Sequence, residues 1–584
     1  MPDARRARLR RVRWLLALAV FAFVLGAYVA ADSGGIGQRA LARSFAQEWA
    51  ARDYAAMYGQ LDPGTLRGAS LAHVENVLRA AGATATLSSA RPAGHPRELA
   101  AGVYEVPVRV RTRLFGTLVL PYRLRITSHE GTARVAWARA LAFPGLRAGE
   151  QLTRTTNLPR RATLLASDGS VLAESPQGAG GGEAGARVSP LGAAAAAVLG
   201  TVGALPADRR AELEGMGVPA QGPVGLSGLE RALDDRLRGT PGGELLAGDR
   251  VLASAEPRPA PPLRTSVSPV LQQATVAALG AQYGGIVAMR PSGQILAVAG
   301  IGLEGLQPPG STFKMVTVSG VLAAHIASPH TVFPYATHAT LDGVKLSNAN
   351  GEECGGTLAT AFAVSCNSVF SPLGVKLGAA RLVSSAERLG FNTPTGIPGV
   401  PESTLPSAGE IHGELEVGST AIGQGSVLAT PLQMATVAAT IADEGQRPQP
   451  TFLPEAAPPA RTRAMPASVA RTVRRLMIGV VRGGTGTAAA IPGVTVAGKT
   501  GTAELKSACQ GDQGANQESP AGGETQETCA SGEAQAANTD AWFAAFAPAL
   551  RPRVVVCVLL VKDGAGGDTA APVAREVLEA DLRR

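Results

Sequence analysis

A serine and a lysine three residues apart are the first candidates for chemistry in this sequence. Ser311 and Lys314 adjoin an apolar segment, Met315–Ile326, whose composition predicts a buried helix. Residues i and i+3 share one face of a helix, so we expect the amine one turn above the hydroxyl. A neutral amine takes up the proton of a serine that attacks a carbonyl, and burial beside a second cation favours that form. The start of a helix also leaves the Ser311 amide free to stabilise an oxyanion.

Taken alone, this spacing is common, and an exposed helix start is the more frequent explanation for it. Two further polar motifs follow in order: Ser365–Asn367 (S-C-N) and Lys499–Thr502 (K-T-G-T), the second at the end of a strand pattern. Lysine is rare in this chain, with six lysines among 54 lysine and arginine residues. Because arginine serves wherever a positive charge suffices, a lysine inside a motif indicates an amine that must lose its proton or act as a compact charge.

Two other segments match nucleotide-binding patterns but lack the structural context. Residues 300–305 fit G-x-G-x-x-G, yet two prolines follow in place of a helix, and no acidic residue stands about 20 residues on. Residues 493–500 fit the P-loop pattern, but V-T-V-A in its middle is typical of a strand. A phosphate cradle needs a loop that opens into a helix. We therefore expect no nucleotide site.

Length and composition predict a globular protein of several domains. The chain has 584 residues, of which 45% are apolar and 17% charged. Its net charge of +8 is concentrated in the arginine-rich residues 1–13, which argues against a nucleic-acid partner. Residues 14–31 carry no charge and would span about 27 Å as a helix, close to the ~30 Å of a hydrocarbon core. We expect a cytoplasmic tail, one transmembrane anchor and an extracytoplasmic remainder; a cleaved signal peptide is the alternative.

Hydrophobic patterns divide the remainder into an α+β region, a mixed region and a dense core-forming region. Helical spacing covers Arg39–Leu61, and strand patterns follow at Val103–Arg111, Leu114–Ile126 and Thr132–Phe143. The domain boundaries predicted from these patterns are 37–150, 154–262 and 263–584. Residues 505–540 are polar and are expected to form a loop or insertion within the last domain.

The three motifs in this order resemble those of class B (monofunctional) penicillin-binding proteins, and the resemblance covers nearly the whole chain. Gly225–Glu230 resembles the family's pedestal, or dimerisation, domain. Residues 37–150 resemble the cone-shaped domain of the methicillin-resistance type, which is related to nuclear transport factor two. The resemblance implies an α+β multidomain protein on a membrane anchor. Its last domain would have the serine transpeptidase fold, with an antiparallel sheet between helices.

The resemblance also implies a catalytic role for five motif residues. Ser311 would be the nucleophile and Lys314 its base during acylation. Ser365 would relay a proton to the leaving amine, and Asn367 would orient Lys314 and the substrate amide. Lys499 would place positive charge near this relay and near the carboxylate of the donor substrate.

The third motif would bind the donor substrate. By resemblance, Thr500 and Thr502 would hydrogen-bond its carboxylate, and Gly501 would let the strand approach the substrate without a side chain in the way. The amides of Ser311 and Thr502 would form the oxyanion hole.

The implied reaction is acyl transfer in peptidoglycan. The serine would attack the penultimate D-Ala carbonyl of a stem peptide, expel the terminal D-Ala, and pass the acyl group to the amine of a neighbouring stem. β-Lactams would acylate the same serine. No cofactor or metal is implied, since the histidines form no recognisable ligand set. A separate membrane glycosyltransferase is the expected partner.

Two alternatives stay open. With water as acceptor the same serine site would make a D,D-carboxypeptidase or a β-lactamase, and a β-lactamase needs a carboxylate that holds water; Glu410, Glu414 and Glu416 lie between the second and third motifs. A non-catalytic β-lactam sensor is the third possibility, but it would need a cytoplasmic signalling domain, for which thirteen residues are too few.

The five cysteines are too few for a disulfide framework. Cys509 and Cys529 flank a polar stretch, and the sequence leaves open whether they pair. Cys557 is expected to be buried in a strand, and Cys366, inside the second motif, is expected to be an inert packing residue.

Overall fold

The computed structural model describes residues 37–583 apart from 130–131, 177–185, 455–460 and 505–537. The predicted tail (1–13), the predicted anchor (14–31) and most of the predicted polar loop therefore lie outside the described residues. Within the described ranges, no helix has both the length and the apolar composition needed to cross a bilayer.

The chain forms two compact units. The first comprises the described residues up to Arg161 together with Ala204–Pro223 and Arg238–Ala260. The second comprises Ala162–Gly203, Val224–Leu237 and the chain from Pro261 onward. All three motifs belong to the second unit.

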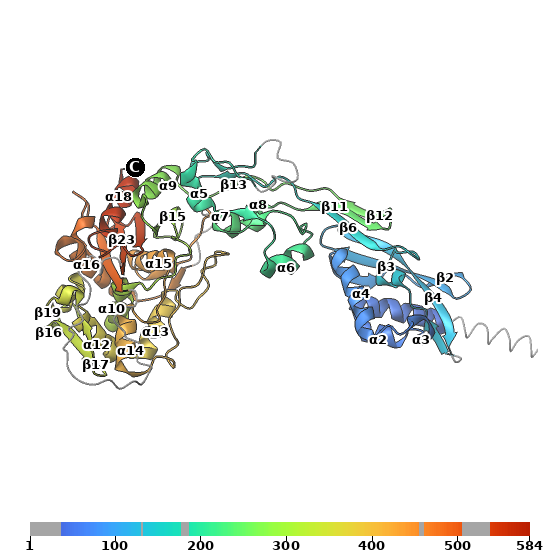
Figure 1. Ribbon diagram of the computed structural model, residues 1–584, viewed down its shortest axis with the longest axis horizontal. Coiled ribbons are helices and arrows are strands. Elements are labelled where there is room, and N and C mark those ends of the chain that lie inside the picture. Colours follow the sequence, from blue (N-terminus) through green and yellow to red (C-terminus); the bar gives the residue numbers. More distant parts are fainter. Residues whose placement is uncertain (1–36, 130–131, 177–185, 455–460, 505–537, 584) are drawn as a thin grey trace, which may run out of the picture. The chain divides into compact units, whose positions relative to one another are not determined.

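The first unit begins with an α+β domain (Figure 1). Its helices are residues 37–51, Tyr54–Gly59 (α2), Pro63–Leu66 (α3) and Leu71–Thr84 (α4). Its strands are Leu87–Pro92 (β1), Arg97–Ala100 (β2), Val103–Thr112 (β3), Thr117–His129 (β4) and Thr132–Val135 (β5). They form an antiparallel sheet in the order β1-β3-β4-β5, with β2 also paired to β3. Side chains alternate between buried and exposed along β3 and β4, so one face packs against the aromatic rings of Phe45, Trp49 and Phe143.

Two elements of this domain differ from the prediction. The predicted helix Arg39–Leu61 is interrupted at Arg52, whose backbone φ is 62°, and a new helix starts because the Asp53 side chain accepts a hydrogen bond from the Ala56 amide. The predicted strand Thr132–Phe143 ends at Val135 and is followed by a 3-10 turn, Arg139–Ala142 (η1). Apolar residues continue through both breaks, so the hydrophobic pattern does not show them.

A second antiparallel sheet, in the order β12-β11-β6, completes the first unit. Its strands are Leu152–Asn157 (β6), Gly242–Ala247 (β11) and Arg250–Ala255 (β12). The short helices Ala207–Arg209 (η2) and Arg210–Gly215 (α6) also belong to this unit.

The second unit starts with short elements that precede its main sheet. They are Leu164–Leu165 (β7), Val171–Ala173 (β8), Ala193–Leu199 (α5), Val202–Gly203 (β9), Val224–Gly225 (β10), Gly228–Ala232 (α7), Asp234–Leu237 (α8) and Leu263–Arg264 (β13). A buried ion pair stabilises this region, with Arg187 Nε 2.7 Å from Glu230 Oε1.

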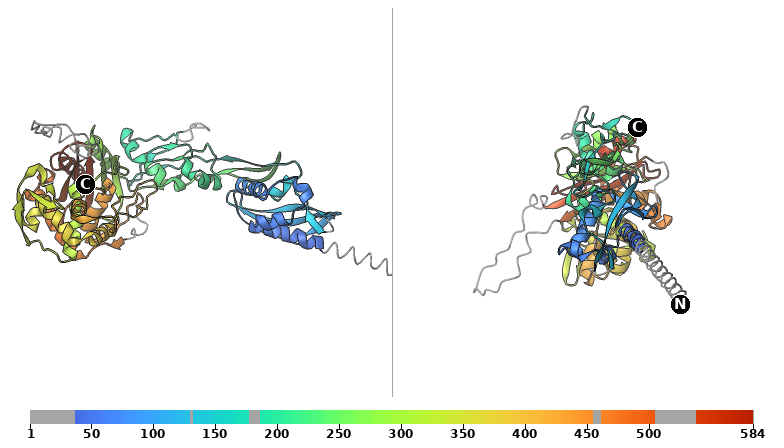
Figure 2. Two further views of the ribbon diagram at one scale, coloured as in Figure 1. Left: turned by 60° about the horizontal axis from the view of Figure 1, so that its bottom comes forward. Right: turned by 90° about the vertical axis from the view of Figure 1, so that its right-hand side faces the viewer.

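A five-stranded antiparallel sheet forms the centre of the second unit, in the order β15-β14-β24-β23-β22. Its strands are Gly284–Met289 (β14), Ile295–Gly300 (β15), Ala497–Glu504 (β22), Thr539–Ala547 (β23) and Val554–Leu560 (β24). The helices Pro269–Leu279 (α9) and Ala570–Leu582 (α18) share one hydrophobic core with it, and Pro431–Ala442 (α15) also packs on the sheet (Figure 2). Every residue of β14, β23 and β24 is buried. The predicted antiparallel sheet between helices is thus confirmed, as is the buried strand position of Cys557 in β24.

The remaining elements complete the second unit. The helices are Gly310–Phe313 (η3), Lys314–Ala323 (α10), Ala349–Gly351 (η4), Leu358–Ala363 (α11), Asn367–Leu377 (α12), Ala379–Arg388 (α13), Gly413–Ala421 (α14), Ala467–Gly483 (α16) and Thr487–Ala489 (η5). Among them, η3 and α16 contact the edge strand β22. The strands form three two-stranded antiparallel sheets: Val332–Ala336 (β16) with Cys354–Thr357 (β19), His338–Leu341 (β17) with Val344–Ser347 (β18), and Gln446–Pro448 (β20) with Arg461–Arg463 (β21).

Glycines allow η3 to lie directly against β22. A Cβ atom on Gly310, where φ is +50°, would lie 2.7 Å from the carbonyl oxygen of Thr502. A Cβ atom on Gly501 would lie 2.8 Å from the carbonyl oxygen of Pro309. Contacts this close exclude any larger residue without a backbone shift. This approach places the first motif beside the third.

Candidate active site

The three motifs meet in a cleft of about 1050 Å³ in the second unit. Ser311 comes from η3, Lys314 begins α10, Ser365 and Asn367 stand where α11 gives way to α12, and Lys499 lies in β22. The lining side chains from the motifs are those of Ser311, Ser365, Asn367, Thr500 and Thr502. Segments separated by more than 180 residues in the sequence therefore contribute to one site.

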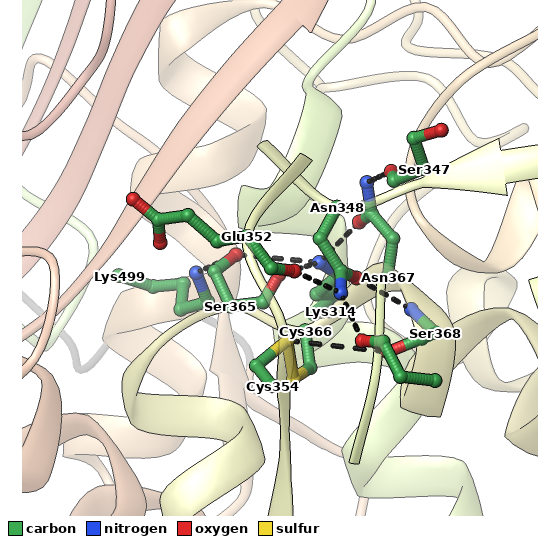
Figure 3. Close-up of a disulfide and its surroundings, with 11 residues drawn as sticks. Lys314, Ser347, Asn348, Glu352, Cys354, Ser365, Cys366, Asn367, Ser368 and Lys499 are labelled. Atoms are coloured by element: carbon green, nitrogen blue, oxygen red, sulfur yellow. Dashed lines mark hydrogen bonds between the residues drawn. A yellow bond between two sulfur atoms is a disulfide. The ribbon is translucent and has the colours of Figure 1, made fainter. Parts of the chain in front are cut away.

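Lys314 is fully buried, and its amine is fixed by the second motif. Its Nζ donates hydrogen bonds of 2.6 Å to the carbonyl oxygen of Ser365 and 2.6 Å to Oδ1 of Asn367 (Figure 3). A neutral amine has two N–H donors and one lone pair, so these two bonds use both donors. The lone pair is then free to accept a proton. The Ser311 hydroxyl makes no hydrogen bond to the described residues and lies in the cleft wall.

The electrostatic environment favours a neutral amine on Lys314. Burial, together with the neighbouring charge of Lys499, holds the pKa of Lys314 well below its ordinary value. Burial also lowers the pKa of Lys499 to about 7. Neither amine forms an ion pair with a carboxylate in the described part of the chain; the aromatic rings of Phe370 and Phe362 lie 5.6 Å from Lys314 and Lys499, respectively. These features suit Lys314 to act as a base.

Ser365 connects the two lysines. Lys499 Nζ donates a 2.9 Å hydrogen bond to Ser365 Oγ, and Lys314 Nζ lies 3.3 Å from the same oxygen. The Ser365 backbone adopts the left-handed region, with φ of 63°, which is uncommon for a residue with a side chain. Because Ser365 Oγ accepts from Lys499, the hydroxyl proton of Ser365 is available to the Lys314 lone pair or to a ligand in the cleft.

Two contacts with residues outside the motif hold the second motif in place: a hydrogen bond and a disulfide. Asn367 Nδ2 donates a 2.8 Å hydrogen bond to the carbonyl oxygen of Ser347 at the end of β18. Cys366 forms a disulfide with Cys354 in β19, at a Cα–Cα distance of 5.9 Å (Figure 3). The prediction that Cys366 is an inert packing residue is therefore wrong. The two cysteines are twelve residues apart in the chain, and only the path of β16–β19 brings them together. Cys509 and Cys529 lie outside the described residues.

The third motif presents alternate side chains to the cleft because it lies in a strand. Thr500 and Thr502 line the cleft, and the Thr500 hydroxyl also lies 2.5 Å from that of Thr485. Gly501 faces the other way, toward Pro309. The expectation that Gly501 makes room for the substrate is therefore corrected. The absence of a side chain at Gly501 makes room for η3.

Comparison with known proteins places this chain in a family. Residues 284–579 match the family model described as the penicillin-binding protein transpeptidase domain, and residues 173–251 match the penicillin-binding protein dimerisation domain. This chain belongs to the penicillin-binding protein transpeptidases. The predicted family and enzyme class, a serine-type D,D-transpeptidase, are confirmed.

Individual relatives agree with this assignment. The chain is 32% identical to the peptidoglycan D,D-transpeptidase PbpA of Mycolicibacterium smegmatis, over 61% of this chain and 80% of the relative. It is 36% identical to PbpA of Mycobacterium tuberculosis, over 47% of this chain and 55% of that protein. The structure of penicillin-binding protein A from M. tuberculosis as a penicillin G acyl-enzyme complex is similar, with a TM-score of 0.53 and 28% identity over 72% of this chain and 99% of that one.

The cleft of this transpeptidase also contains residues that the sequence analysis did not select. Thr485, Lys345 and Glu352 line it, and no motif marks them. Lys345 is one of the six lysines, so the scarcity of lysine was an available signal. Conversely, the three candidate carboxylates of a hydrolase lie outside the cleft lining. The Glu410 carboxylate accepts from Ser407, that of Glu416 accepts from the His412 amide, and Glu414 is exposed.

The pH dependence of serine acylation should reveal the coupling between the two lysines. Acylation needs a neutral Lys314, so the rate falls as the pH drops through the Lys314 pKa. In Lys499→Met the pKa of Lys314 should rise, because one cause of its depression is removed, and the acid limb should move to higher pH. Above about pH 7 Lys499 itself is neutral, so the two normalised profiles should converge. Stopped-flow acylation by a thioester acyl donor measures this effect.

Lys499→Arg is the matched control for that experiment. Arginine stays charged at every pH used. The acid limb of the Lys499→Arg variant should therefore lie at the same pH as that of the parent transpeptidase, or at a lower pH. An acid limb that is unmoved in Lys499→Met would contradict the coupling.

The disulfide should support both stability and catalysis. Replacing Cys354 and Cys366 together by Ser should cost about 3 kcal/mol of unfolding free energy, as expected for a loop of this length. It should also slow acylation, since Cys366 stands between Ser365 and Asn367. Thermal unfolding and acylation rates test both effects. Refolding the parent protein in a reductant should produce the same loss of stability and the same slower acylation, and the double variant should not change. If reduction does not affect the parent protein, the prediction is wrong.

Proposed function

We propose that this chain cross-links peptidoglycan stem peptides through an acyl-enzyme on Ser311, with the roles predicted from its motifs. The observation that carries the proposal is the buried Lys314 amine, whose two short hydrogen bonds to Ser365 and Asn367 leave its lone pair free. A lysine held in this way, without a carboxylate partner among the described residues, is suited to proton abstraction.

Acylation proceeds in one addition and one elimination. Ser311 Oγ attacks the carbonyl carbon of the penultimate D-Ala, and its proton passes to Lys314 Nζ. The amides of Ser311 and Thr502 stabilise the oxyanion. The C–N bond then breaks, and the leaving D-Ala amine receives the proton of Ser365, which is restored from Lys314. Thr500 and Thr502 hold the carboxylate of the donor during both steps.

Deacylation transfers the acyl group to the amine of a second stem peptide. The penicillin G acyl-enzyme of the M. tuberculosis relative supports the same attack on a β-lactam carbonyl. There the leaving amine stays tethered to the acyl group, so β-lactams are proposed as covalent inhibitors of this chain. Gly501 contributes indirectly, by allowing β22 to lie against η3.

We further propose that residues 1–13 are cytoplasmic, that 14–31 anchor the chain in the membrane, and that catalysis takes place outside the cytoplasm. The domain boundaries 37–150, 154–262 and 263–584 belong to the same proposal. The two matched family models describe transpeptidase and dimerisation domains. A separate membrane glycosyltransferase, which would supply the glycan strands that carry the stem peptides, is also proposed as a partner.

Labelling of the full-length protein with fluorescent penicillin tests the nucleophile. The parent protein should form a covalent adduct that persists for minutes, and Ser311→Ala should form none. Ser407→Ala is the matched control, because Ser407 is exposed and its hydroxyl bonds to Glu410 outside the cleft. A stable adduct in Ser311→Ala would disprove the assignment. Rapid loss of the parent adduct would instead indicate a hydrolase.

Fractionation of cells that express the full-length chain tests its location and its partner. The chain should stay with the membranes after a high-salt wash, because an apolar anchor is not released by screening charge. A protein with glycan-polymerising activity should co-purify after mild detergent extraction. Recovery in the soluble fraction would refute the anchor, and purification without such activity would count against the partner.

A further inference from the structure

Glu352 places a carboxylate in the active-site cleft that has no assigned role. It follows η4 and lines the cleft together with Ser311, Ser365 and Asn367. Its side chain is exposed and forms no hydrogen bond or ion pair with the described residues, Lys345 in the same wall included. A carboxylate left uncompensated inside a binding cleft is suited to a cationic group on a ligand.

The backbone of Glu352 is fixed to the catalytic second motif. Asn348 Nδ2 donates a 2.8 Å hydrogen bond to the Glu352 carbonyl oxygen, and Asn348 Oδ1 accepts a 2.8 Å hydrogen bond from the amide of Ser368 in α12. Two residues after Glu352, Cys354 forms the disulfide to Cys366. Figure 3 shows the Glu352 side chain extending to the side of the motif on which Ser365 and Lys499 lie. The carboxylate is therefore carried by a rigid segment beside the proton relay.

The second half-reaction brings a cationic group to this part of the cleft. The acceptor is a primary amine, which is mostly an ammonium at neutral pH. By microscopic reversibility it approaches the acyl carbon along the path on which the first amine left, which is the path served by Ser365. Asp568 also lines the cleft, but it belongs to the segment held against the third motif: the amide of Gly566, two residues before it, lies 3.4 Å from Thr502 Oγ1. Of these two carboxylates, only Glu352 is attached to the second motif.

We infer that Glu352 binds the ammonium group of the acceptor stem peptide and so selects an amine over water for deacylation. The inference rests on the proposed function and names the acceptor subsite of that same cleft. The bound ammonium gives one proton to solvent, and the neutral amine forms an N–C bond to the acyl carbon. The C–Oγ bond to Ser311 breaks, and the second amine proton returns through Lys314 to Ser311 Oγ. An ion pair with Glu352 also stabilises the ammonium and so opposes loss of its proton. Glu352 therefore contributes to acceptor binding, and its effect is on KM more than on kcat.

The test compares aminolysis with acylation in the full-length protein. A D-alanyl thioester serves as donor, and the acceptor is a peptide with one side-chain primary amine. Glu352→Gln should raise the acceptor KM about 10-fold and shift the product ratio toward hydrolysis by a similar factor, as expected for loss of a charge-assisted contact. Its rate of acylation by penicillin should match that of the parent protein. Aminolysis by hydroxylamine, which is unprotonated at neutral pH, should also be unchanged.

Two matched variants give the experiment its controls. Glu353→Gln alters the adjacent exposed carboxylate, which does not line the cleft, and should behave as the parent protein does. Asp568→Asn alters the carboxylate near the third motif and should not raise the acceptor KM.

The inference is overturned if Glu352→Gln keeps the parent acceptor KM. It is also overturned if its penicillin acylation falls in step with aminolysis, or if Asp568→Asn shows the acceptor effect in its place. A parent protein that reacts with neither penicillin nor thioester would instead refute the proposed function itself.

Discussion

Two lysine amines share one serine in the interior of this molecule, and the rest of the active site depends on that arrangement. Lys314 and Lys499 are fully buried, and both reach Ser365. Two ammonium groups so close, with no ion pair to a carboxylate of the described residues, would repel each other and would lose their hydration. Burial lowers the pKa of both amines, and the charge of Lys499 lowers the pKa of Lys314 further, so Lys314 is suited to act as a base. Carbonyl and hydroxyl oxygens suffice to orient them.

The scaffold has to bury these two amines and hold them in place. The central sheet does so because helices cover it, and its inner strands are buried throughout. The edge strand β22 comes close enough to η3 because Gly310 and Gly501 have no side chains at the contact. On the other side, the Cys354–Cys366 disulfide and the Asn367–Ser347 hydrogen bond hold the second motif against movement. Three elements from distant parts of the chain are thus fixed around one pair of amines.

The cleft separates two kinds of recognition. Thr500 and Thr502 face it from β22 with hydroxyl groups suited to a carboxylate, and the side of the second motif carries Glu352, which is suited to an ammonium. A transpeptidase needs both, because its donor ends in a carboxylate and its acceptor is an amine. A hydrolase needs only the first. Transpeptidation and hydrolysis share the same acyl-enzyme on serine and differ in the acceptor. On our inference, the negative charge of Glu352 favours the amine acceptor.

Much of the fold and site was determined by the sequence alone. The order S-x-x-K, S-x-N, K-T-G and the scarcity of lysine identified Ser311, Lys314 and Lys499, since these signals depend on residue type and short spacing. Alternation along Val103–Arg111 predicted β3, and the apolar run around Cys557 predicted a buried strand, because such periodicity is local. Only the tertiary structure decided the partner of Cys366, the direction in which Gly501 faces, and the position of Glu352 beside Ser365. Each depends on how distant segments approach one another, and the spacing of residues along a chain does not encode that approach.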